Sequence, residues 1–597
     1  MAKDFNVDQE ALGKAYDGRL MRRLLKYLKP YRKYVVLAIL LHLFTASLGP
    51  LRPYLTKIAV DDHIATKDYG GLAEIVALIF GALFLQAIIQ YVLMYLTQWI
   101  GQKTILDLRK EIFAHVQRLA ASFFDKTPVG RLVTRTTNDV EALNQMFGAG
   151  VVTAFSDVFI VGWILAFMFY TDVELSFVTL AALPLLVYGT FVFKKKAREA
   201  YRDVRLHLAR LNAYMQEHVA GAAIVQLFGK ERREAKRYAN INADHRQANY
   251  DSILYHAVFF PFVELVSALA LALIVWHGGG LAKNDVLTLG VLFAFIQYVE
   301  MFFRPIRDLA EKYNIMQTAM ASSERVFKLL DDETVVRNPE RSAAIERARG
   351  EVEFQHVSLS YLKDGKHALR DFSLKIAPGE TVALVGHTGA GKSTVINVLL
   401  RFYDHDEGRI FIDGTDAAAL DERELRRHIG VAPQDVSLFQ GTIRSNITMN
   451  NPDISEERMI EAAKATGAHE FIERLPNGYD ETVAERGATL SVGQKQLISF
   501  ARALAHDPEI IALDEATSSV DAETEGKAQA AVEKLLEGRT SIVVAHRLST
   551  IQSADRIVVM HKGRVREIGS HQELLAQKGI YHRLYRLQYK DQAIDAS

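Results

Sequence analysis

Apolar residues gather into six long runs in the first half of the chain, whereas the second half alternates shorter apolar stretches with polar ones. Each run approaches the roughly 20 residues that an α-helix needs to cross a hydrocarbon layer about 30 Å thick. The pattern therefore predicts six membrane-spanning helices, and buried helices of a large soluble protein are the alternative. The runs lie near residues 34–58, 72–100, 147–170, 174–193, 254–277 and 285–303.

Basic residues are distributed unevenly between these runs. The connections near 101–146 and 194–253 are long and rich in Lys and Arg, whereas the other three are short and contain only Lys67 and Lys283 as bases. Because cytoplasmic connections carry an excess of Lys and Arg, we expect the N-terminus and both long connections to be cytoplasmic. Both long connections are also rich in helix-forming residues, which predicts helices that continue past the membrane and then turn. The turns would lie near 122–130 and 228–237.

The first 33 residues form a separate polar and basic segment. Residues 1–10 lack the apolar stretch of a cleavable signal, so membrane insertion is expected to use the internal runs. Between residues 11 and 33, basic residues are interleaved with leucines at helical spacing, which is typical of a basic amphipathic helix at a membrane surface.

A few polar residues interrupt the fifth and sixth apolar runs. Ionisable groups at membrane depth are costly unless they face a partner or a wet cavity. Glu264, Gln297 and Glu300 are therefore candidates for a substrate cavity. Glu300 and Arg304 are also spaced to pair on one helix face, so an ion pair and a substrate contact both remain open. His277 is a further ionisable residue in these runs.

The second half contains a Gly-rich turn between a buried strand and a helix. The apolar run 381–385 leads into residues 386–393, which fit the phosphate-loop pattern of Gly, four residues and Gly-Lys-Ser. Lys392 is predicted to reach the β- and γ-phosphates, and the Ser393 hydroxyl to ligate Mg²⁺. A turn that binds nothing is the alternative. The residues predicted to surround the phosphates are Gly386, His387, Thr388, Gly389, Ala390, Gly391, Lys392, Ser393 and Thr394.

Two more apolar strands end in polar residues. One ends in Asp514 and Glu515, and the other is followed by His546. The carboxyl ends of parallel strands meet at one sheet edge, so these side chains should lie near the phosphate loop. Asp514 is then predicted to hold the Mg²⁺ shell, Glu515 to polarise an attacking water, and His546 to contact the γ-phosphate. A strand-end His is often only structural.

Composition bounds the remaining choices. With 71 Lys and Arg against 71 Asp and Glu, the chain has no net charge that favours a nucleic-acid partner. The absence of Cys excludes disulfides, thiolate catalysis and cysteine metal sites. At 597 residues several domains are expected. We predict an N-terminal amphipathic segment, a transmembrane domain, a linker, an ATP-binding α/β domain and a C-terminal tail, with bounds 1–33, 34–320, 321–350, 351–590 and 591–597.

The motifs of the second half together closely resemble the nucleotide-binding domain of ATP-binding cassette (ABC) transporters. Beside the phosphate loop, they are Leu490-Ser-Val-Gly-Gln494, Leu513-Asp-Glu515, Ser518-Ser-Val-Asp521 and His546. With six apolar runs ahead of one cassette, the chain resembles a half-transporter of the ABC exporters. The resemblance implies an α-helical membrane domain of six transmembrane helices with long cytoplasmic extensions, followed by an α/β P-loop ABC ATPase domain. It also implies ATP and Mg²⁺ as cofactors and export by alternating access.

Further roles follow only from this resemblance. Tyr361 matches the aromatic residue that stacks on adenine, and Gln434 the residue that touches Mg²⁺ and senses the membrane domain. Two cassettes of such exporters close head to tail, so that the signature of one chain meets the ATP of the other. The stretch Glu485-Arg-Gly487 matches the part that meets the loop tips near 122–130 and 228–237. The implied signature and D-loop residues are Ser491, Val492, Gly493, Gln494 and Asp521.

Val492 departs from the family pattern, which has Gly at this position of the signature. A β-branched side chain at a helix start hinders the close approach of a phosphate to backbone N–H groups. An imperfect signature beside an intact Glu515 resembles one subunit of a heterodimeric exporter, whose partner has the consensus signature but lacks the Glu. A homodimeric exporter or lipid flippase is the alternative.

We therefore expect a multi-pass protein of a bacterial inner membrane whose cassette is cytoplasmic. Its partners would be the lipid bilayer, a second ABC half-transporter and an amphipathic, lipid or peptide substrate, and no nucleic acid. A soluble cassette ATPase conflicts with the six apolar runs. An ATP-gated protein that does not pump conflicts with the intact Glu515. An importer usually has its membrane and cassette parts on separate chains.

Overall fold

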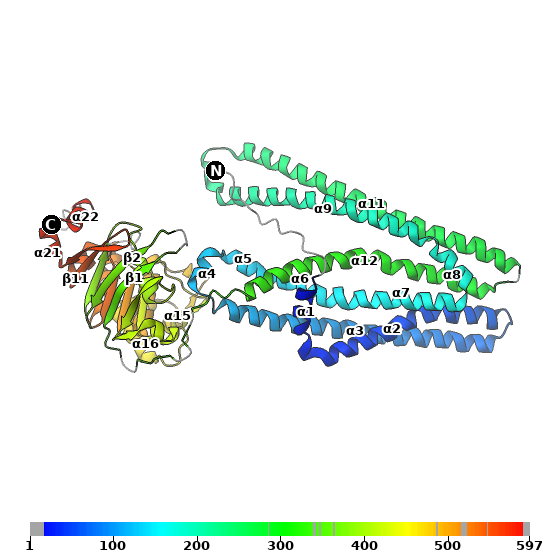
Figure 1. The fold of residues 1–597 in the computed structure, drawn as a ribbon, viewed down its shortest axis with the longest axis horizontal. Helices are drawn as coiled ribbons and strands as arrows, with labels where there is room; N and C mark the ends of the chain where they lie inside the picture. Colours follow the sequence, from blue (N-terminus) through cyan, green and yellow to red (C-terminus); the bar gives the residue numbers. More distant parts are fainter. Residues whose placement is uncertain are drawn as a thin grey trace. The chain divides into compact units, whose positions relative to one another are not determined.

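The computed structural model describes residues 17–284, 286–336, 338–339, 342–345, 348–361, 365–484, 487–514, 522–545 and 547–588. The described chain forms two compact units (Figure 1). The first comprises Met1–Gln117 and Val129–Asp332, and the second comprises Arg118–Pro128 and Glu333–Ser597. Each unit has its own apolar core.

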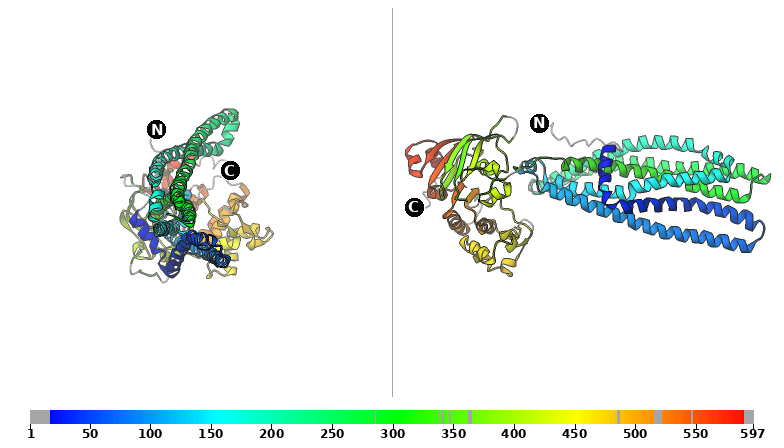
Figure 2. Two further views of the ribbon diagram at one scale, coloured as in Figure 1. Left: turned by 90° about the vertical axis from the view of Figure 1, so that its right-hand side faces the viewer. Right: turned by 60° about the horizontal axis from the view of Figure 1, so that its bottom comes forward.

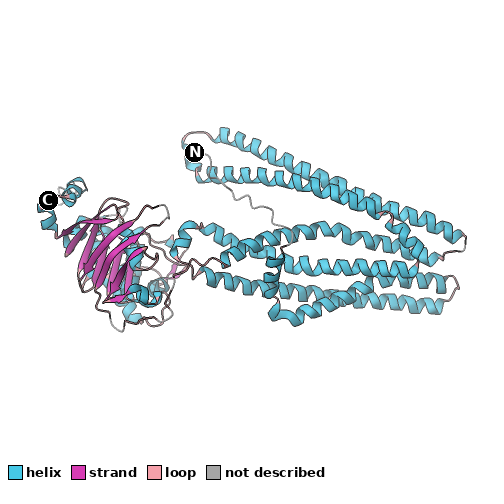
Figure 3. Cartoon of the chain, viewed as in Figure 1, coloured by secondary structure: helices cyan, strands magenta, loops and turns pink. Residues whose placement is uncertain are grey.

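The first unit is helical throughout its described part (Figure 3). Its α-helices are α1 (Gly18–Lys26), α2 (Arg32–Ile58), α3 (Tyr69–Val116), α5 (Val129–Thr134), α6 (Val140–Gln145), α7 (Val151–Thr171), α8 (Val173–Leu180), α9 (Leu183–Ala220), α10 (Ala222–Leu227), α11 (Glu231–Lys283) and α12 (Leu289–Leu330). Short 3-10 or π-helical segments occupy Lys29–Tyr31, Ala59–Ile64, Arg135–Asp139 and Met146–Gly150.

Several of these helices are suited to a membrane. Among the described residues, four helical segments are long and apolar enough to cross it, and a further apolar helix, Ser156–Thr171, is shorter. The four are Lys29–Ile64, Tyr69–Val116, Val173–Ala220 and Glu231–Lys283. α3 and α11 continue well beyond their apolar runs, which confirms the predicted helical extensions. α2 and α3 lie side by side, as do α9 and α11 (Figure 2).

Helix α12 forms hydrogen bonds with other segments at its N-terminal end and along its length. The Asp61 carboxylate accepts hydrogen bonds from Thr288 Oγ1 at 2.6 Å and from the Gly290 N–H at 2.8 Å. Farther along, the buried Tyr298 hydroxyl donates to the Pro50 carbonyl at 3.1 Å. These contacts hold α12 against α2 and the segment that follows it.

Helix α1 lies within the segment predicted to be a membrane-surface helix, and part of it packs against protein. Its Leu24 side chain is fully buried, and Arg23 forms two hydrogen bonds, of 2.6 and 2.7 Å, with Asp331 at the end of α12. Tyr27 donates to Glu111 of α3 at 2.7 Å. The apolar side of α1 is therefore covered in part by protein, because the neighbouring helices supply both an apolar surface and carboxylates.

Two of the predicted domain bounds can be set beside the observed elements. α12 runs without a break to Leu330, so residues 321–330 of the predicted linker are helical. The segment Arg118–Pro128, which was placed in the transmembrane domain, folds with the second unit instead. Its Ala120 N–H donates to the Thr334 carbonyl at 2.8 Å.

The second unit contains three sheets within its described residues. Their orders are β12-β11-β3-β10-β9-β6, β2-β1-β4-β5 and β7-β8. In the first sheet all neighbours pair in parallel except β12, whereas the second is antiparallel. The strands are β1 (Val352–Leu359), β2 (Leu369–Ile376), β3 (Thr381–Val385), β4 (Glu407–Ile412), β5 (Thr415–Asp416), β6 (Ile429–Ala432), β7 (Gly441–Thr442), β8 (Thr482–Val483), β9 (Ile510–Asp514), β10 (Thr540–Val544), β11 (Arg556–His561) and β12 (Arg564–Gly569).

The second unit also contains α-helices in its described part. They are α4 (Ala121–Lys126), α13 (Lys392–Leu399), α14 (Glu422–Arg427), α15 (Ile443–Thr448), α16 (Glu456–Ala465), α17 (Ala468–Ile472), α18 (Val492–Ala505), α19 (Ala522–Leu536), α20 (Leu548–Ser553), α21 (His571–Ala576) and α22 (Ile580–Gln588). Successive residues of β3 belong to opposite cores, with Ala383 in the core that contains Phe500 of α18 and Leu384 in the core that contains Phe354 of β1. Both sheet faces are buried, which explains the unbroken apolar runs of the parallel strands.

Candidate functional site

The Gly-rich turn after β3 has a backbone that requires glycine. Gly389 and Gly391 adopt φ angles of +79° and +102°, in the left-handed region that side chains disfavour. A Cβ atom on Gly391 would lie 2.6 Å from the Ala368 carbonyl oxygen, and one on Gly386 would lie 2.4 Å from the Met560 carbonyl oxygen. The turn is therefore packed against backbone from both sides and holds one conformation.

Lys392 begins helix α13 and places its cation on this turn. The side chain is buried, and Nζ donates to the Gly386 carbonyl at 2.7 Å and to the His387 carbonyl at 3.3 Å. Burial lowers the pKa of Lys392, and the charge of Asp514 partly opposes that shift. The N-cap of α13 is Gly391, which supplies no side-chain cap in the described structure. Its first N–H groups therefore remain available to an anion.

The other predicted residues of the loop divide by exposure. His387, Thr388, Gly389 and Ser393 are exposed, whereas Ala390 and Thr394 are buried. The exposed set follows the outer rim of the turn and includes the predicted Mg²⁺ ligand Ser393. The loop therefore presents one polar surface above the carboxyl end of β3.

Parallel pairing brings the ends of four strands to this same edge. Leu384 of β3 lies opposite Val544 of β10, and Val544 lies opposite Asp514 of β9. On the far side of β9, Leu513 lies opposite Ala432, two residues before Gln434. Gln434 is exposed.

Three predicted residues lie outside the described part of the chain. Glu515 follows Asp514, His546 follows Ala545, and Asp521 belongs to the stretch after Glu515. Their catalytic or D-loop roles therefore remain predictions, as does the role of Glu485.

Tyr361 lies beside α13. Its hydroxyl donates to Thr394 Oγ1 at 3.2 Å and accepts from Asn397 Nδ2 at 3.3 Å. Its ring meets that of Tyr403 edge to face, with 4.7 Å between the centroids. A half-buried aromatic ring next to the phosphate loop is compatible with stacking on a base. Asn397 and Tyr403 were not predicted, because neither belongs to a recognisable motif.

The signature residues form the start of helix α18. Ser491 is the N-cap, and its hydroxyl accepts from the Gln494 N–H at 3.2 Å while Gln494 Oε1 accepts from the Ser491 N–H at 3.0 Å. Gly493 is buried. Val492 occupies the first helical position, and its side chain is 61% exposed. The isopropyl group therefore stands on the outer surface of the helix start.

The residues of the sheet edge fit a magnesium-bound nucleoside triphosphate. The turn offers backbone N–H groups and a buried ammonium to phosphates, and the predicted metal ligands Ser393, Gln434 and Asp514 all supply oxygen, which Mg²⁺ prefers. No group of three or more His, Cys, Asp or Glu residues suited to a metal occurs in the described ranges. A metal held jointly by protein and phosphate oxygens agrees with that sparse ligand set.

The polar residues predicted for the membrane region are scattered. Glu264 and Glu300 are exposed, and Gln297 is half-buried and donates to the Phe293 carbonyl at 3.5 Å. The possible ion pair of Glu300 with Arg304 is not formed in the described structure, where both side chains are exposed. Substrate contact by Glu264, Gln297 and Glu300 remains a prediction.

The structure also shows polar clusters that the sequence analysis missed. Lys312 of α12 pairs with Asp157 of α7, and both side chains are largely buried. Asp139 is buried and accepts hydrogen bonds from Ser322 and Arg325 of α12. The sequence analysis did name His277, whose Nε2 lies 2.7 Å from Glu174 Oε1. The isolated Asp157 in an apolar run was the signal that could have revealed its pair.

Comparison with known proteins agrees with this geometry. Residues 35–306 match the family model of the ABC transporter transmembrane region, and residues 369–518 match the family model described as ABC transporter. The ABC transporter ATP-binding protein YknV of Bacillus subtilis is 38% identical over 582 residues, which cover 97% of this chain and 96% of YknV. The ATP-dependent lipid A-core flippase of Syntrophus aciditrophicus is 35% identical over 575 residues, covering 96% and 95%.

A solved structure is similar over nearly the whole chain. A bacterial Atm1-family ABC exporter with ATP bound is 30% identical, with a TM-score of 0.76 over 94% of this chain and 98% of the exporter.

Proposed function

Because the chain belongs to the ABC transporter family, we propose that it is the subunit carrying the catalytic Glu of a heterodimeric ABC exporter. It is an integral multi-pass membrane protein that couples ATP hydrolysis to transport, and it requires a second half-transporter, identical or different. The proposed membrane is the bacterial inner membrane, and the proposed substrate is hydrophobic or amphipathic.

The observation that carries the heterodimer is Val492 at the first turn of α18. Its exposed side chain stands where a partner's γ-phosphate would approach the helix start. Because a β-branched group prevents close approach to those N–H groups, the ATP held by the partner would turn over slowly. Glu515 would then serve the other site, which combines this chain's phosphate loop with the partner's signature.

The positions of the residues at the sheet edge suggest a role for each in ATP hydrolysis. Lys392 would bind the β- and γ-phosphates, and Glu515 would orient and polarise the attacking water. His546 would contact the γ-phosphate. The ligands that would hold Mg²⁺ are Ser393, Gln434 and Asp514. Magnesium, when bound, would neutralise charge on the phosphates.

Transport would follow from differential binding. ATP binds best when two cassettes close on it, so its binding favours the closed pair, and hydrolysis removes that preference. Segment Arg118–Pro128, which folds with the second unit, would carry closure to the membrane helices. The cavity would switch from inward to outward facing as a result.

A homodimeric exporter or lipid flippase is the second candidate. The similarity to a lipid A-core flippase over almost the whole chain favours it. In a homodimer both sites would contain Val492 and Glu515, and each would have to work with the altered signature.

Native mass spectrometry of the detergent-purified complex distinguishes the two candidates. The chain should be expressed together with its neighbouring genes, so that a natural partner is present. The heterodimer predicts one copy of this chain with one different subunit of similar mass. Two copies of this chain, without another subunit, contradict it. ATP-dependent uptake into inside-out vesicles then tests export itself.

A further inference from the structure

A second cavity of the ABC domain lies apart from the phosphate loop. Its volume is about 630 Å³, within the range of roughly 300–1,000 Å³ that is typical of small-molecule sites. It is lined by the start of β6, the end of α18, and residues near α14 and α16. The phosphate loop lies at the carboxyl end of the parallel sheet, whereas Ile429 and Pro508 place this cavity at the opposite end.

Positive charge dominates the walls of this cavity. The basic lining residues are Arg426, Arg427, Arg458, Arg502 and His506, and Asp453 is the acidic lining residue among those described. Two carboxylates outside the wall compensate in part. Glu422 lies 3.2 Å from Arg426, and Asp507 lies 3.0 Å from Arg458 but also 3.0 Å from Arg539. Among the described residues, four arginines line the cavity beside one lining carboxylate, Asp453, and Asp507 divides its charge between Arg458 and Arg539, which is outside the wall.

Two of the arginines have no carboxylate of their own in the described structure. Arg502 is half-buried and donates to the carbonyls of Asn446 and Ser437 at 2.7 and 3.2 Å. Arg427 is exposed, and the described residues provide no hydrogen-bond or ion-pair partner for its side chain. Partial burial and, after it, the positive charges of Arg458 and Arg502 lower the pKa of His506.

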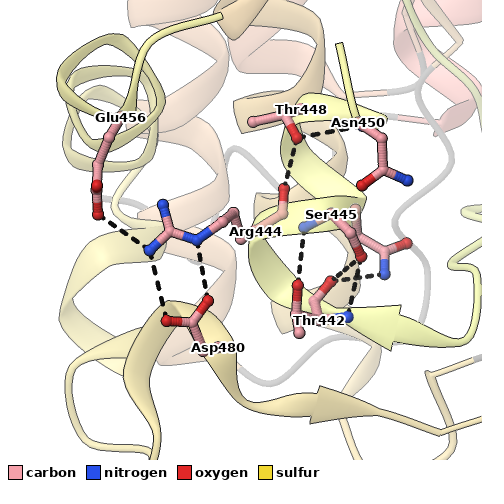
Figure 4. A network of polar contacts seen from close by, with 8 residues as sticks. Thr442, Arg444, Ser445, Thr448, Asn450, Glu456 and Asp480 are labelled. Atoms are coloured by element: carbon pink, nitrogen blue, oxygen red, sulfur yellow. Dashed lines mark hydrogen bonds and ion pairs between the residues drawn. The ribbon is translucent and has the colours of Figure 1, made fainter. Parts of the chain in front are cut away.

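The cavity wall also contains apolar residues. Ile429, Met449, Ile454 and Pro508 are lining residues. Helix α15, which ends beside Met449, is anchored by Arg444, whose guanidinium lies 3.0 Å from Glu456 and 2.9 Å from Asp480 (Figure 4). The cavity thus offers arginines for phosphate and apolar residues for an organic group.

Two elements connect this cavity with the predicted ATP machinery. Strand β6 starts at Ile429 in the cavity wall and leads to Gln434 at the other end of the sheet. Helix α18 starts at the signature and ends in the wall at Arg502 and His506. A ligand between these elements would bear on both at once.

We propose that this cavity is a second anion site, which binds a phosphate-bearing organic molecule of nucleotide size and thereby regulates the cassette. The site is separate from the phosphate loop and does not depend on whether the exporter is a heterodimer. Its ligand bridges the end of α18 and the start of β6, and so alters how readily the signature and Gln434 take their closed positions.

The test measures mant-ADP binding to the full-length transporter in detergent. Every variant also carries Lys392→Ala, which disables the phosphate loop of this chain. Binding to a nucleotide site on a partner chain is the same in all variants and therefore cancels when their affinities are compared. Saturable binding should remain, and Arg427→Glu should weaken it about tenfold or more through loss of charge-assisted contacts. Arg423→Glu is the matched control, because Arg423 is exposed on the same short helix but does not line the cavity. Arg427→Gln is a second variant, which removes the charge without reversing it and should also weaken binding. If its melting temperature equals that of the control, misfolding does not explain the weaker binding.

Two competitors and one structural readout complete the test. Inorganic pyrophosphate should displace mant-ADP and adenosine should not, since the arginines recognise phosphate. Pyrophosphate should also slow hydrogen exchange in β6 and α18 of the Arg423→Glu variant but not of the Arg427→Glu variant. Equal affinities of the Arg423 and Arg427 variants, or equal competition by adenosine, overturn the proposal.

Discussion

Two helix starts in the ABC domain, those of α13 and α18, are both predicted to face ATP, yet they are built in opposite ways. α13 begins after a left-handed glycine, without a side-chain cap and with a buried Lys392 on the loop. α18 begins with a capping box in which Ser491 and Gln494 satisfy each other's N–H groups. Val492 additionally projects from its first turn.

The difference concerns which N–H groups are available. An uncapped helix start offers its donors to an external anion, whereas a capped start already has an acceptor of its own. α13 is therefore prepared for phosphate within this chain. The cap of α18 is complete within this chain. A partner's phosphate would bind only to the remaining backbone N–H groups of this helix start, and Val492 obstructs them.

Among the tests of this comparison, loss of the Lys392 cation should have the largest effect. Lys392→Ala should reduce ATP turnover about 100- to 1,000-fold, as is typical when one charge-stabilising donor is removed. Because burial disfavours the charged Lys392, the melting temperature without nucleotide should not fall. Lys464→Ala, an exposed lysine on α16, is the control and should leave turnover unchanged. If turnover of the Lys392→Ala variant stays within about tenfold of the parent's, the Lys392 cation is not required for hydrolysis.

A methyl group on Gly391 should have the next largest effect. Its φ of +102° and the 2.6 Å approach to the Ala368 carbonyl force the turn to shift in Gly391→Ala. Strain of about 1–3 kcal/mol predicts a nucleotide affinity weaker by roughly tenfold or more, measured by titration with mant-ATP. Gly414→Ala is the matched control, since Gly414 also has a positive φ of +77° but nothing lies within 4 Å of its Cβ position. Equal losses in both variants would mean that backbone strain alone is measured.

Val492→Gly tests the α18 half of the comparison. If only the site with Glu515 turns over, restoring glycine should raise total ATP turnover by less than about twofold, because the improved signature serves a slow site. Phosphate release at saturating ATP is the measurement. A rise of about tenfold would indicate that both sites have competent catalytic groups, as in a homodimer.

Removing the cap of α18 should have a smaller effect on stability. Ser491→Ala loses one N-cap, worth about 1 kcal/mol, and should lower the melting temperature by a few degrees. Ser455→Ala removes the equivalent cap of α16, where Ser455 accepts from the Arg458 N–H, and should destabilise similarly. Because the signature of this chain serves the slow site, total ATP turnover should change by less than about twofold in both variants. A large fall confined to the Ser491 variant would indicate that this signature serves an active site, as in a homodimer.

The smallest effect concerns α15, which like α18 begins with a capping box. The hydrogen bond from Arg444 lowers the pKa of the exposed Asp480. Asp480 therefore stabilises the fold above its unfolded pKa, near 4, and this contribution disappears as the pH falls through the lower folded value. The melting temperatures of parent and Asp480→Asn protein should differ slightly at pH 7 and converge near pH 3. A gap that widens at low pH would reverse the assigned direction.

Local patterns predicted much of the fold and of the phosphate site. The strand 381–385, the Gly-rich turn and the following helix were all found where the sequence placed them, because each depends on residues adjacent in the chain. The apolar runs likewise predicted long helices that extend beyond the membrane. Parallel pairing then brought Asp514 to the edge where the sequence analysis expected it.

Contacts between distant segments could not be read from the same patterns. Arg23 and Asp331 pair across the whole first unit, and Asp157 pairs with Lys312 from another helix. Residues 321–330 of the predicted linker are helical, because α12 continues to Leu330. The roles of Glu515, His546 and Asp521 remain predictions.

By itself, the sequence determined that the chain has long apolar helices followed by a phosphate-binding strand, turn and helix, since spacing and residue type dictate these local structures. Only the tertiary structure decided which helix starts are capped, which apolar face of α1 is buried, and where arginines converge on a second cavity. These features depend on side chains that are far apart in sequence, and packing alone brings them together.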